Sequence, residues 1–382
     1  MNIAVVCYHT LGGSGIIAYE LGSRMAEMGH TIHFIGKKAP FRMTDIQENV
    51  TAHTVDVMDY NVFSYPPYTL SLSSRICEIV ENCDIDIVHC HYAVPHAIAG
   101  ILARDMSSRD VKVVTTLHGT DITLVGSHPS FFNITKYAIE KSDAVTAVSD
   151  HLKKRTERVF DIQPGVVRRI YNFIDSRPPD HDACCECLEK KGCGKHIIVH
   201  ASNMRNVKQP MDLIAIFEKV HHALNGNCEL WMIGEGPLRP DLERSVKEKG
   251  LSDAVQFFGV TYTPEKFFMC ADLFLLTSRE ESFGLAALEA MVCRTAVVAY
   301  SIGGLPEVVE DGHSGRLLDF EDIDGMARAC TELLTNRENL EKIKANAYQA
   351  AVNRFPRDKI INSYLNLYKE LLTGLPSNID ST

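Results

Sequence analysis

The sequence predicts an α/β protein with two domains, each built on a parallel β-sheet. Two observations carry this prediction. The chain has 382 residues, more than a single hydrophobic core usually organises, so two domains are expected. Short apolar runs typical of strands also alternate with amphipathic runs typical of helices along most of the chain, which is the pattern of parallel sheets joined by helices.

The composition excludes several classes of protein. Hydrophobic residues make up 45% and charged residues 23%, as in soluble globular proteins. The net charge of -10 leaves no basic excess for general nucleic-acid binding. No apolar run is long enough to span a bilayer, and the N-terminal stretch lacks the basic segment of a secretory signal. We expect a cytoplasmic protein with no nucleic-acid partner and no stable membrane association; the sequence leaves open whether it forms a homo-oligomer.

The first domain is predicted over residues 1–171. The run 84–92 is continuous and apolar, as expected of a strand buried on both faces. Residues 16–30 carry apolar side chains at helical spacing and end near Gly29. This alternation predicts a Rossmann-like unit with strands in 2–8, 31–36, 84–92, 111–119 and 143–149.

A second Rossmann-like domain is predicted over residues 196–350. It follows a connection, residues 172–195, that contains Pro178 and Pro179 and has no clear periodicity. A helix is expected over 351–374 because its apolar residues repeat at helical spacing, and residues 375–382 form a tail. The strands of this domain are expected in 195–203, 228–236, 254–260, 271–278 and 295–301.

The chain has twelve cysteines, most of them isolated in predicted strands and helices. In a reducing compartment such residues behave as small buried apolar groups. One cluster, flanked by His181 and His196, lacks the two spaced Cys-x-x-Cys pairs typical of zinc sites. We favour a solvent-exposed connection over a metal site there and expect no metal; what the cluster does stays open. Its members are Cys184, Cys185, Cys187 and Cys193.

Ligands of parallel sheets bind beyond the carboxyl ends of the strands, so we searched the loops there. The first such loop, Gly12 to Gly15, is rich in small residues, which let an anion approach the backbone at a helix start. It lacks the dinucleotide pattern, so a dehydrogenase is disfavoured, and a simple tight turn is the alternative. Tyr92 and His118 each stand at the end of a predicted strand and are candidate binding residues.

Arg205 and Lys208 stand three residues apart in the loop after the first strand of the second domain. Cations at the start of a helix are electrostatically unfavourable unless an anion binds there. Arginine grips phosphate oxygens with two hydrogen bonds, and lysine adds a mobile charge. The pair therefore suits a diphosphate, with a solvated basic helix start as the alternative.

The stretch 278–291, "SREESFGLAALEAM", places two carboxylates on either side of a helix start. Eight residues of helix rise about 12 Å, so Glu281 and Glu289 cannot act on one atom. They can instead bind hydroxyls at two ends of one ligand, while backbone amides near Phe283, Gly284 and Leu285 hold a phosphate. Hydroxyls on both sides of a phosphate describe a sugar nucleotide. A surface glutamate plus a helix glutamate is the alternative.

The ordered set of these motifs resembles the retaining family 4 glycosyltransferases of the GT-B fold. It comprises the Gly-rich first loop, Arg205-x-x-Lys208, Glu281-x7-Glu289 and "GGLPEVV" at 303–309. The resemblance covers essentially the whole chain. It implies two Rossmann-like domains facing across a cleft, acceptor-binding at 1–171 and nucleotide-sugar-binding at 196–350, with the C-terminal helix packing back on the first.

Further stretches, among them "HCHYAVPHAI" and "VVTTLHGTDIT", are similar to the members of this family that begin bacillithiol biosynthesis. This resemblance implies UDP-N-acetylglucosamine as the donor and L-malate as the acceptor. The chain departs from the pattern in the Cys-rich segment 181–196 and at Arg294, where such enzymes usually have glycine.

The resemblance also implies roles for the donor-side residues. Arg205 and Lys208 would bind the diphosphate, Glu281 the hexose hydroxyls and Glu289 the ribose. His118 would contact the sugar near its reacting carbon, while Gly13 would let the diphosphate approach.

For malate, the candidates are Ser14, Tyr92 and Thr116, with Arg42 for a carboxylate. The implied mechanism is front-face substitution with retention, without a cofactor or an essential metal. Three alternatives stay open: another acceptor, such as an inositol phosphate or a lipid-linked glycan; a sugar-nucleotide epimerase; and a non-catalytic sugar-nucleotide binding module.

Overall fold

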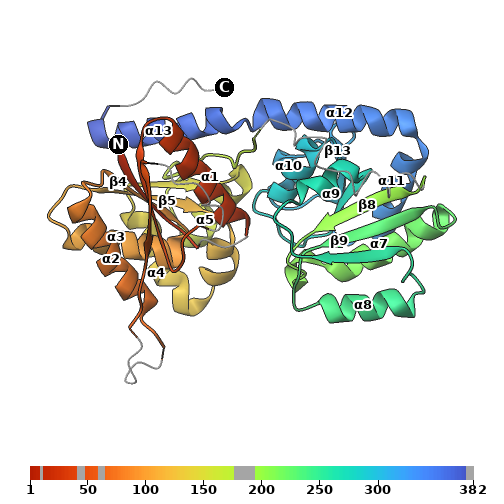
Figure 1. Ribbon diagram of the computed structural model, residues 1–382, viewed down its shortest axis with the longest axis horizontal. Helices are drawn as coiled ribbons and strands as arrows, with labels where there is room; N and C mark the ends of the chain where they lie inside the picture. Colours follow the sequence, from red (N-terminus) through yellow and green to blue (C-terminus); the bar gives the residue numbers. More distant parts are fainter. Residues whose placement is uncertain (9–11, 41–47, 59–64, 176–193, 376–382) are drawn as a thin grey trace. The chain divides into compact units, whose positions relative to one another are not determined.

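The computed structural model describes residues 1–8, 12–40, 48–58, 65–175 and 194–375. The chain forms two compact units (Figure 1). The first comprises Met1–Asn172 and Asp358–Thr382, and the second comprises Phe173–Arg357. Each unit contains a parallel sheet and the helices that cover it, as predicted. No helix in the described ranges is long and apolar enough to cross a bilayer.

Among the described residues, the first unit has a 7-stranded sheet with the order β3-β2-β1-β4-β5-β6-β7. Neighbouring strands pair in parallel throughout, for example β1 with β2 and β4. The strands are β1 (Asn2–Val6), β2 (Thr31–Gly36), β3 (Val50–Thr54), β4 (Ile87–His91), β5 (Lys112–Leu117), β6 (Ala144–Ala147) and β7 (Val167–Arg169). The connecting helices are α1 (Gly13–Glu27), α2 (Tyr68–Asn82), η1 (Ala93–Ala97), α3 (Ile98–Met106), η2 (Asp121–Val125), α4 (Pro129–Lys141) and α5 (Asp150–Phe160).

The second unit has a 6-stranded parallel sheet with the order β10-β9-β8-β11-β12-β13 within the described ranges. Its strands are β8 (His196–Ala201), β9 (Cys228–Ile233), β10 (Val255–Gly259), β11 (Leu273–Leu276), β12 (Ala296–Tyr300) and β13 (Gly315–Leu318). Its helices are η4 (Asn206–Lys208), α7 (Pro210–Ala223), α8 (Arg239–Glu248), α9 (Glu265–Cys270), α10 (Leu285–Val292), η5 (Leu305–Glu307), α11 (Ile323–Thr335) and α12 (Arg337–Arg354).

Central strands are apolar on both faces because helices cover both sides of each sheet. Strand β4 is buried at all of its positions, and so are β11 and β12. Full burial of one such aliphatic side chain contributes about 1.5–3 kcal/mol. The loops that carry the predicted site residues follow directly after these and the neighbouring strands.

The last helix, α13 (Arg357–Thr373), belongs to the first unit although the second unit precedes it in sequence. Its Tyr368 hydroxyl lies 2.6 Å from Nδ1 of His89 in β4. A single helix was predicted over 351–374, but α12 ends at Arg354 and α13 begins at Arg357. Pro356, which has no amide hydrogen to donate, lies between them.

We expect Tyr368→Phe to destabilise the first unit by about 1–3 kcal/mol, because it leaves a ring nitrogen of buried His89 without its partner. The loss should appear as a lower urea midpoint at unchanged slope. Tyr65→Phe is the matched control, since that tyrosine is 85% exposed. Equal stability of Tyr368→Phe and the parent would show that the hydrogen bond contributes nothing to holding α13.

Candidate active site

The strand order of each sheet reverses at one point, between β1 and β4 in the first and between β8 and β11 in the second. Loops leaving the two flanking strands diverge there, and open parallel sheets bind their ligands at this place. The predicted site residues that the structure describes gather mainly in the loops around these two points.

At the first point, the structure brings together two hydroxyls that lie far apart in the sequence. Ser14 is in the first turn of α1, and Tyr92 follows β4 directly; their hydroxyl oxygens are hydrogen-bonded. Burial raises the pKa of Tyr92 well above its usual value, so the phenol keeps its proton and can donate it in a hydrogen bond. Gly13, the first residue of α1, is exposed beside them.

His118 joins the same group from the end of β5. Its Nε2 lies 2.8 Å from Nδ1 of His91, and its ring centroid is 5.2 Å from that of Tyr92. Burial lowers the pKa of His118 to about 3, so the imidazole is neutral at pH 7. It can therefore offer hydrogen bonds to a sugar but no positive charge.

Thr116 lies inside the first unit and is fully buried. Its hydroxyl contacts Nε2 of His89 at 2.7 Å, the Thr146 hydroxyl at 2.7 Å and the Tyr364 hydroxyl at 3.3 Å. This hydroxyl is thus part of the network that holds α13, and it could reach a ligand only if those bonds were broken. The Thr116 carbonyl accepts from the Tyr92 amide at 2.9 Å, so the backbone of Thr116, rather than its hydroxyl, adjoins Tyr92.

At the second point, Lys208 and Glu281 form an ion pair, with Nζ 2.6 Å from Oε1. Lys208 ends the short helix η4 after β8, and Glu281 lies in the loop after β11. Their side chains are only 23% and 13% exposed, so solvent screens the pair weakly. Ser278 also donates its hydroxyl to Oε1 of Glu281 at 2.7 Å. Arg205, just before η4, is exposed.

A glycine pair supports Glu281 from the loop after β12. The Gly304 amide donates to the Glu281 carbonyl at 2.9 Å. Gly303 has φ of +58°, and a Cβ on it would collide with that same carbonyl. The sequence contains this signal in "GGLPEVV", but the motif alone does not indicate which backbone group it contacts. Ser278 was likewise missed, since a serine between a strand and a glutamate is common in loops.

Helix α10 begins at Leu285, so the predicted helix start is confirmed. Gly284 precedes it with φ of +97°, a conformation that favours glycine. Phe283 is 2% exposed, and its ring meets Phe355 edge-on at 5.3 Å, so only its backbone is left to bind a ligand. Glu289 lies on the second turn of α10 and is partly exposed.

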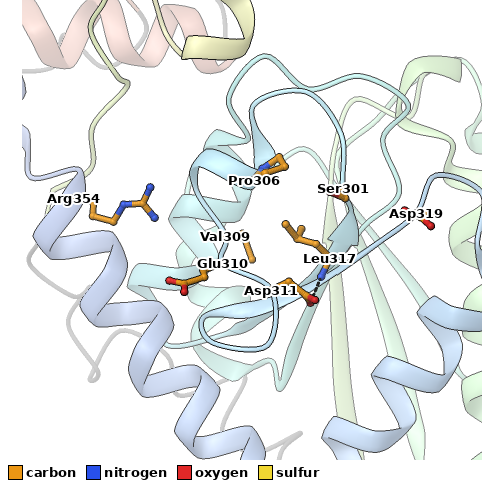
Figure 2. A pocket seen from close by; sticks show the side chains of 8 residues that line it. All are labelled: Ser301, Pro306, Val309, Glu310, Asp311, Leu317, Asp319 and Arg354. Carbon is orange, nitrogen blue, oxygen red and sulfur yellow. Dashed lines mark hydrogen bonds between the residues drawn. The ribbon is translucent and has the colours of Figure 1, made fainter.

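A hollow of about 650 Å³ opens beside the loops that follow β12 and β13 (Figure 2). Its wall includes Arg354, whose guanidinium donates to the Glu307 carbonyl at 2.6 Å, and Asp311, which accepts from the Leu317 amide at 2.9 Å. None of the predicted site residues lines this hollow. The loop that carries Gly304 forms part of the wall of this hollow. The same loop also binds the Glu281 carbonyl, so it contacts both the hollow and the Glu281 loop.

Two predictions lie outside the described residues: Arg42 as a carboxylate ligand, and the Cys cluster in the connection. Among the residues that the structure does describe, no group of three or more His, Cys, Asp or Glu side chains could hold a metal ion.

Two family models match the chain: "Glycosyltransferase Family 4" over residues 11–177 and "Glycosyl transferases group 1" over residues 189–350. The N-acetyl-alpha-D-glucosaminyl L-malate synthase of Bacillus anthracis is 37% identical over 375 residues, which cover 97% of each chain. This chain belongs to the family 4 glycosyltransferases. The glycosyltransferase is therefore an enzyme that uses a sugar nucleotide, as predicted.

Solved structures agree on the fold of this glycosyltransferase. A glycosyltransferase from Rickettsia africae superposes with a TM-score of 0.80 at 21% identity and covers 98% of this chain and 99% of its own. A sucrose-phosphate synthase from Thermosynechococcus elongatus gives 0.81 at 19% identity, with 98% and 100% covered. At these identities the likeness shows the fold alone, and the predicted GT-B fold is confirmed.

Proposed function

We propose that this glycosyltransferase transfers N-acetylglucosamine from UDP-N-acetylglucosamine to the hydroxyl of L-malate, with retention of the α configuration. The products are N-acetyl-α-D-glucosaminyl L-malate and UDP, and the reaction is the first step of bacillithiol synthesis in the cytoplasm. The observation that carries the proposal is the 37% identity to the Bacillus anthracis synthase over nearly the full length of both chains. At 97% coverage the match extends over both units rather than over one of them alone.

The second unit would hold the donor. Arg205 and Lys208 would bind the diphosphate oxygens, together with the backbone amides near Phe283, Gly284 and Leu285 at the start of α10. Glu281 would accept hydrogen bonds from the hexose hydroxyls, and Glu289 from the ribose. Lys208 and Glu281 form an ion pair with each other, so each would exchange that partner for a donor group on binding.

The first unit would hold the acceptor. The hydrogen-bonded hydroxyls of Ser14 and Tyr92 would bind malate, and neutral His118 would contact the transferred sugar near its reacting carbon. Gly13, exposed at the start of α1, would leave room for the diphosphate. Arg42 remains proposed for a malate carboxylate.

The proposed chemistry needs no protein nucleophile. The bond from the anomeric carbon to the diphosphate oxygen breaks, and the malate hydroxyl oxygen bonds to that carbon on the same face. The malate proton passes to an oxygen of the departing diphosphate, which leaves as UDP. Lys208 and Arg205 would stabilise the charge that develops on the leaving group, so neither cofactor nor metal is required. The rest of the acceleration would come from holding the malate hydroxyl beside the departing diphosphate oxygen, on the same face of the sugar.

The test is incubation of the protein with UDP-N-acetylglucosamine, with and without L-malate, followed by UDP assay, product mass and anomeric configuration by NMR. The expected result is malate-dependent release of UDP and a product with the α linkage. A parallel arm with inositol phosphate tests another acceptor. Equal UDP release with and without malate would contradict the proposal. Recovery of an altered sugar nucleotide would also contradict it and would indicate an epimerase.

Ser14→Ala should raise the KM for malate roughly tenfold with little change in the donor KM, because it removes one hydroxyl contact worth about 1.5 kcal/mol with a charged ligand. Ser73→Ala is the matched control: that hydroxyl donates only to its own helix, at the Thr69 carbonyl, 2.7 Å away. A malate KM in Ser14→Ala equal to that of the control variant would remove Ser14 from the acceptor site.

A further inference from the structure

Asp121 is a buried carboxylate between the two loops that carry Tyr92 and His118. It is 2% exposed and begins η2, just after β5. Its Oδ1 accepts from the amides of Gly119 at 2.9 Å and His118 at 3.3 Å. Its Oδ2 accepts from the amide of Ala93 at 3.1 Å. One side chain thus ties the turn after β4 to the loop after β5.

The turn that Asp121 holds is strained. Tyr92 has φ of +83° and ψ of 137°, a region that non-glycine residues rarely occupy. Such a backbone conformation is energetically unfavourable for a residue with a side chain and persists only where its surroundings fix it. The Ala93 amide, adjacent to this residue, is the one bound by Oδ2. The direction of the Tyr92 ring therefore depends on a contact that Asp121 provides.

Asp121 does not serve as a helix cap or as half of an ion pair. A capping side chain accepts amides that follow it in its helix, whereas these three amides all precede Asp121 in sequence. Within the described ranges, the ion pairs of the structure do not include it. Burial raises the pKa of Asp121 to about 6, so the group is still largely ionised at pH 7 and accepts with both oxygens.

We infer that Asp121 is a positioning residue of the transferase: it fixes the loops bearing Tyr92 and His118 in the arrangement that transfer requires. This inference rests on the proposed roles of those two residues. Asp121 itself would touch neither substrate, because its two oxygens are occupied by backbone amides. A buried charge without a cation is costly, and the three amide bonds at this point offset that cost.

The inference predicts a graded loss of turnover. Asp121→Asn keeps one acceptor oxygen but turns the other into a donor, so one of the two loops loses its anchor. Asp121→Ala releases both loops. We expect kcat to fall roughly 10- to 100-fold in the alanine variant, since small displacements of contacting groups cost this much. The asparagine variant should lie between it and the parent. The donor dissociation constant should change less than about threefold, because donor contacts are proposed mainly in the second unit.

Asp143→Asn is the matched control. Its Oδ2 accepts the Val113 amide at 2.8 Å and lies 3.0 Å from Arg104, at the opposite end of β5 from His118. We expect it to lose stability in urea without losing kcat. A second readout is hydrogen exchange of the intact protein: in Asp121→Asn, exchange should rise in segments 92–97 and 118–121 and stay unchanged in the second unit.

Measuring kcat and hydrogen exchange together distinguishes a failure of the positioning role of Asp121 from a failure of the proposed function. Faster exchange in both segments with unchanged kcat would overturn the positioning role while leaving the malate reaction intact. Unchanged exchange with a lower kcat would also overturn it, because Asp121 would then act by another route. If the parent shows no malate-dependent transfer, the proposed function fails, and kcat is measured with the acceptor that the parent does use. Parallel losses of kcat and stability in Asp121→Asn and Asp143→Asn would reduce Asp121 to a structural residue.

Discussion

Lys208→Ala is expected to lower kcat on the order of 100- to 1,000-fold, the usual cost of removing one group that stabilises charge in a transition state. The reason is that Lys208 would face the phosphate oxygen from which the sugar departs. The substitution also leaves the Glu281 carboxylate, only 13% exposed, without the cation 2.6 Å away. Steady-state kinetics with saturating malate measure the effect.

Glu289→Ala is the contrasting variant at the other end of the proposed donor. We expect it to raise the donor KM roughly 10- to 100-fold, since it removes charged hydrogen bonds to the ribose, and to change kcat less. A Lys208→Ala enzyme that turns over like the parent would refute the role of that lysine. A Glu289→Ala enzyme with parental donor affinity would refute the ribose contact.

Gly303→Ala should abolish most of the activity. Its φ of +58° costs an alanine about 1–2 kcal/mol, and the new Cβ would collide with the carbonyl of Glu281, which is backbone and cannot rotate away. The loop carrying Glu281 must then move. We expect kcat to fall roughly 100-fold, as for other misplacements near an ångström, together with a lower urea midpoint.

Gly250→Ala is the control that separates the effect of backbone strain from the effect of the steric collision with Glu281. Gly250 also has positive φ, +68°, but a Cβ on it would meet no atom within 4 Å. Its alanine variant should lose about 1 kcal/mol of stability from backbone strain and keep its turnover. If both variants lose activity equally, or if Gly303→Ala remains fully active, the contact with Glu281 is not what fixes this loop.

The central strands were predictable from the sequence, whereas three of the four edge strands were not; the fourth, β10, lies within the strand predicted over 254–260. The buried strands β11 and β12 are continuous apolar runs and β4 is interrupted only by two buried histidines, and the predictions found all three. The strands that were missed, β3, β7 and β13, all lie at sheet edges. An edge strand is partly solvated and needs fewer apolar residues, so β7, with sequence VRR, carries little periodic signal.

Residue types near the strand ends predicted which loops to examine, but not which atoms meet. Lys208 and Glu281 were assigned to different parts of a donor, and their ion pair depends on two loops far apart in sequence. Thr116 stands only two residues before His118, but it lies within β5, where its hydroxyl is buried against α13, whereas His118 lies beyond the last residue of the strand. Asp121 escaped notice because a single aspartate after a strand has many structural uses.

One departure from the family pattern has a physical explanation. Arg294 stands where the resemblance predicts glycine, and its φ is +57°, a conformation that favours glycine. Its guanidinium lies 4.5 Å from the centre of the Tyr348 ring. A cation–π contact of this kind contributes about 0.5–1 kcal/mol at exposed sites, which offsets part of the backbone cost.

The return of α13 to the first unit has a consequence for synthesis on the ribosome. The second unit is one continuous stretch, Phe173–Arg357, whereas the first is completed only by residues from Asp358 onward. The buried contacts of His89 and Thr116 with the two tyrosines of α13 therefore cannot form until the chain is nearly finished. Domains that fold during translation usually do so in order from the N-terminus. The architecture favours the reverse order here: the second unit can close its core first, and the first unit is completed only when the last segment has left the exit tunnel.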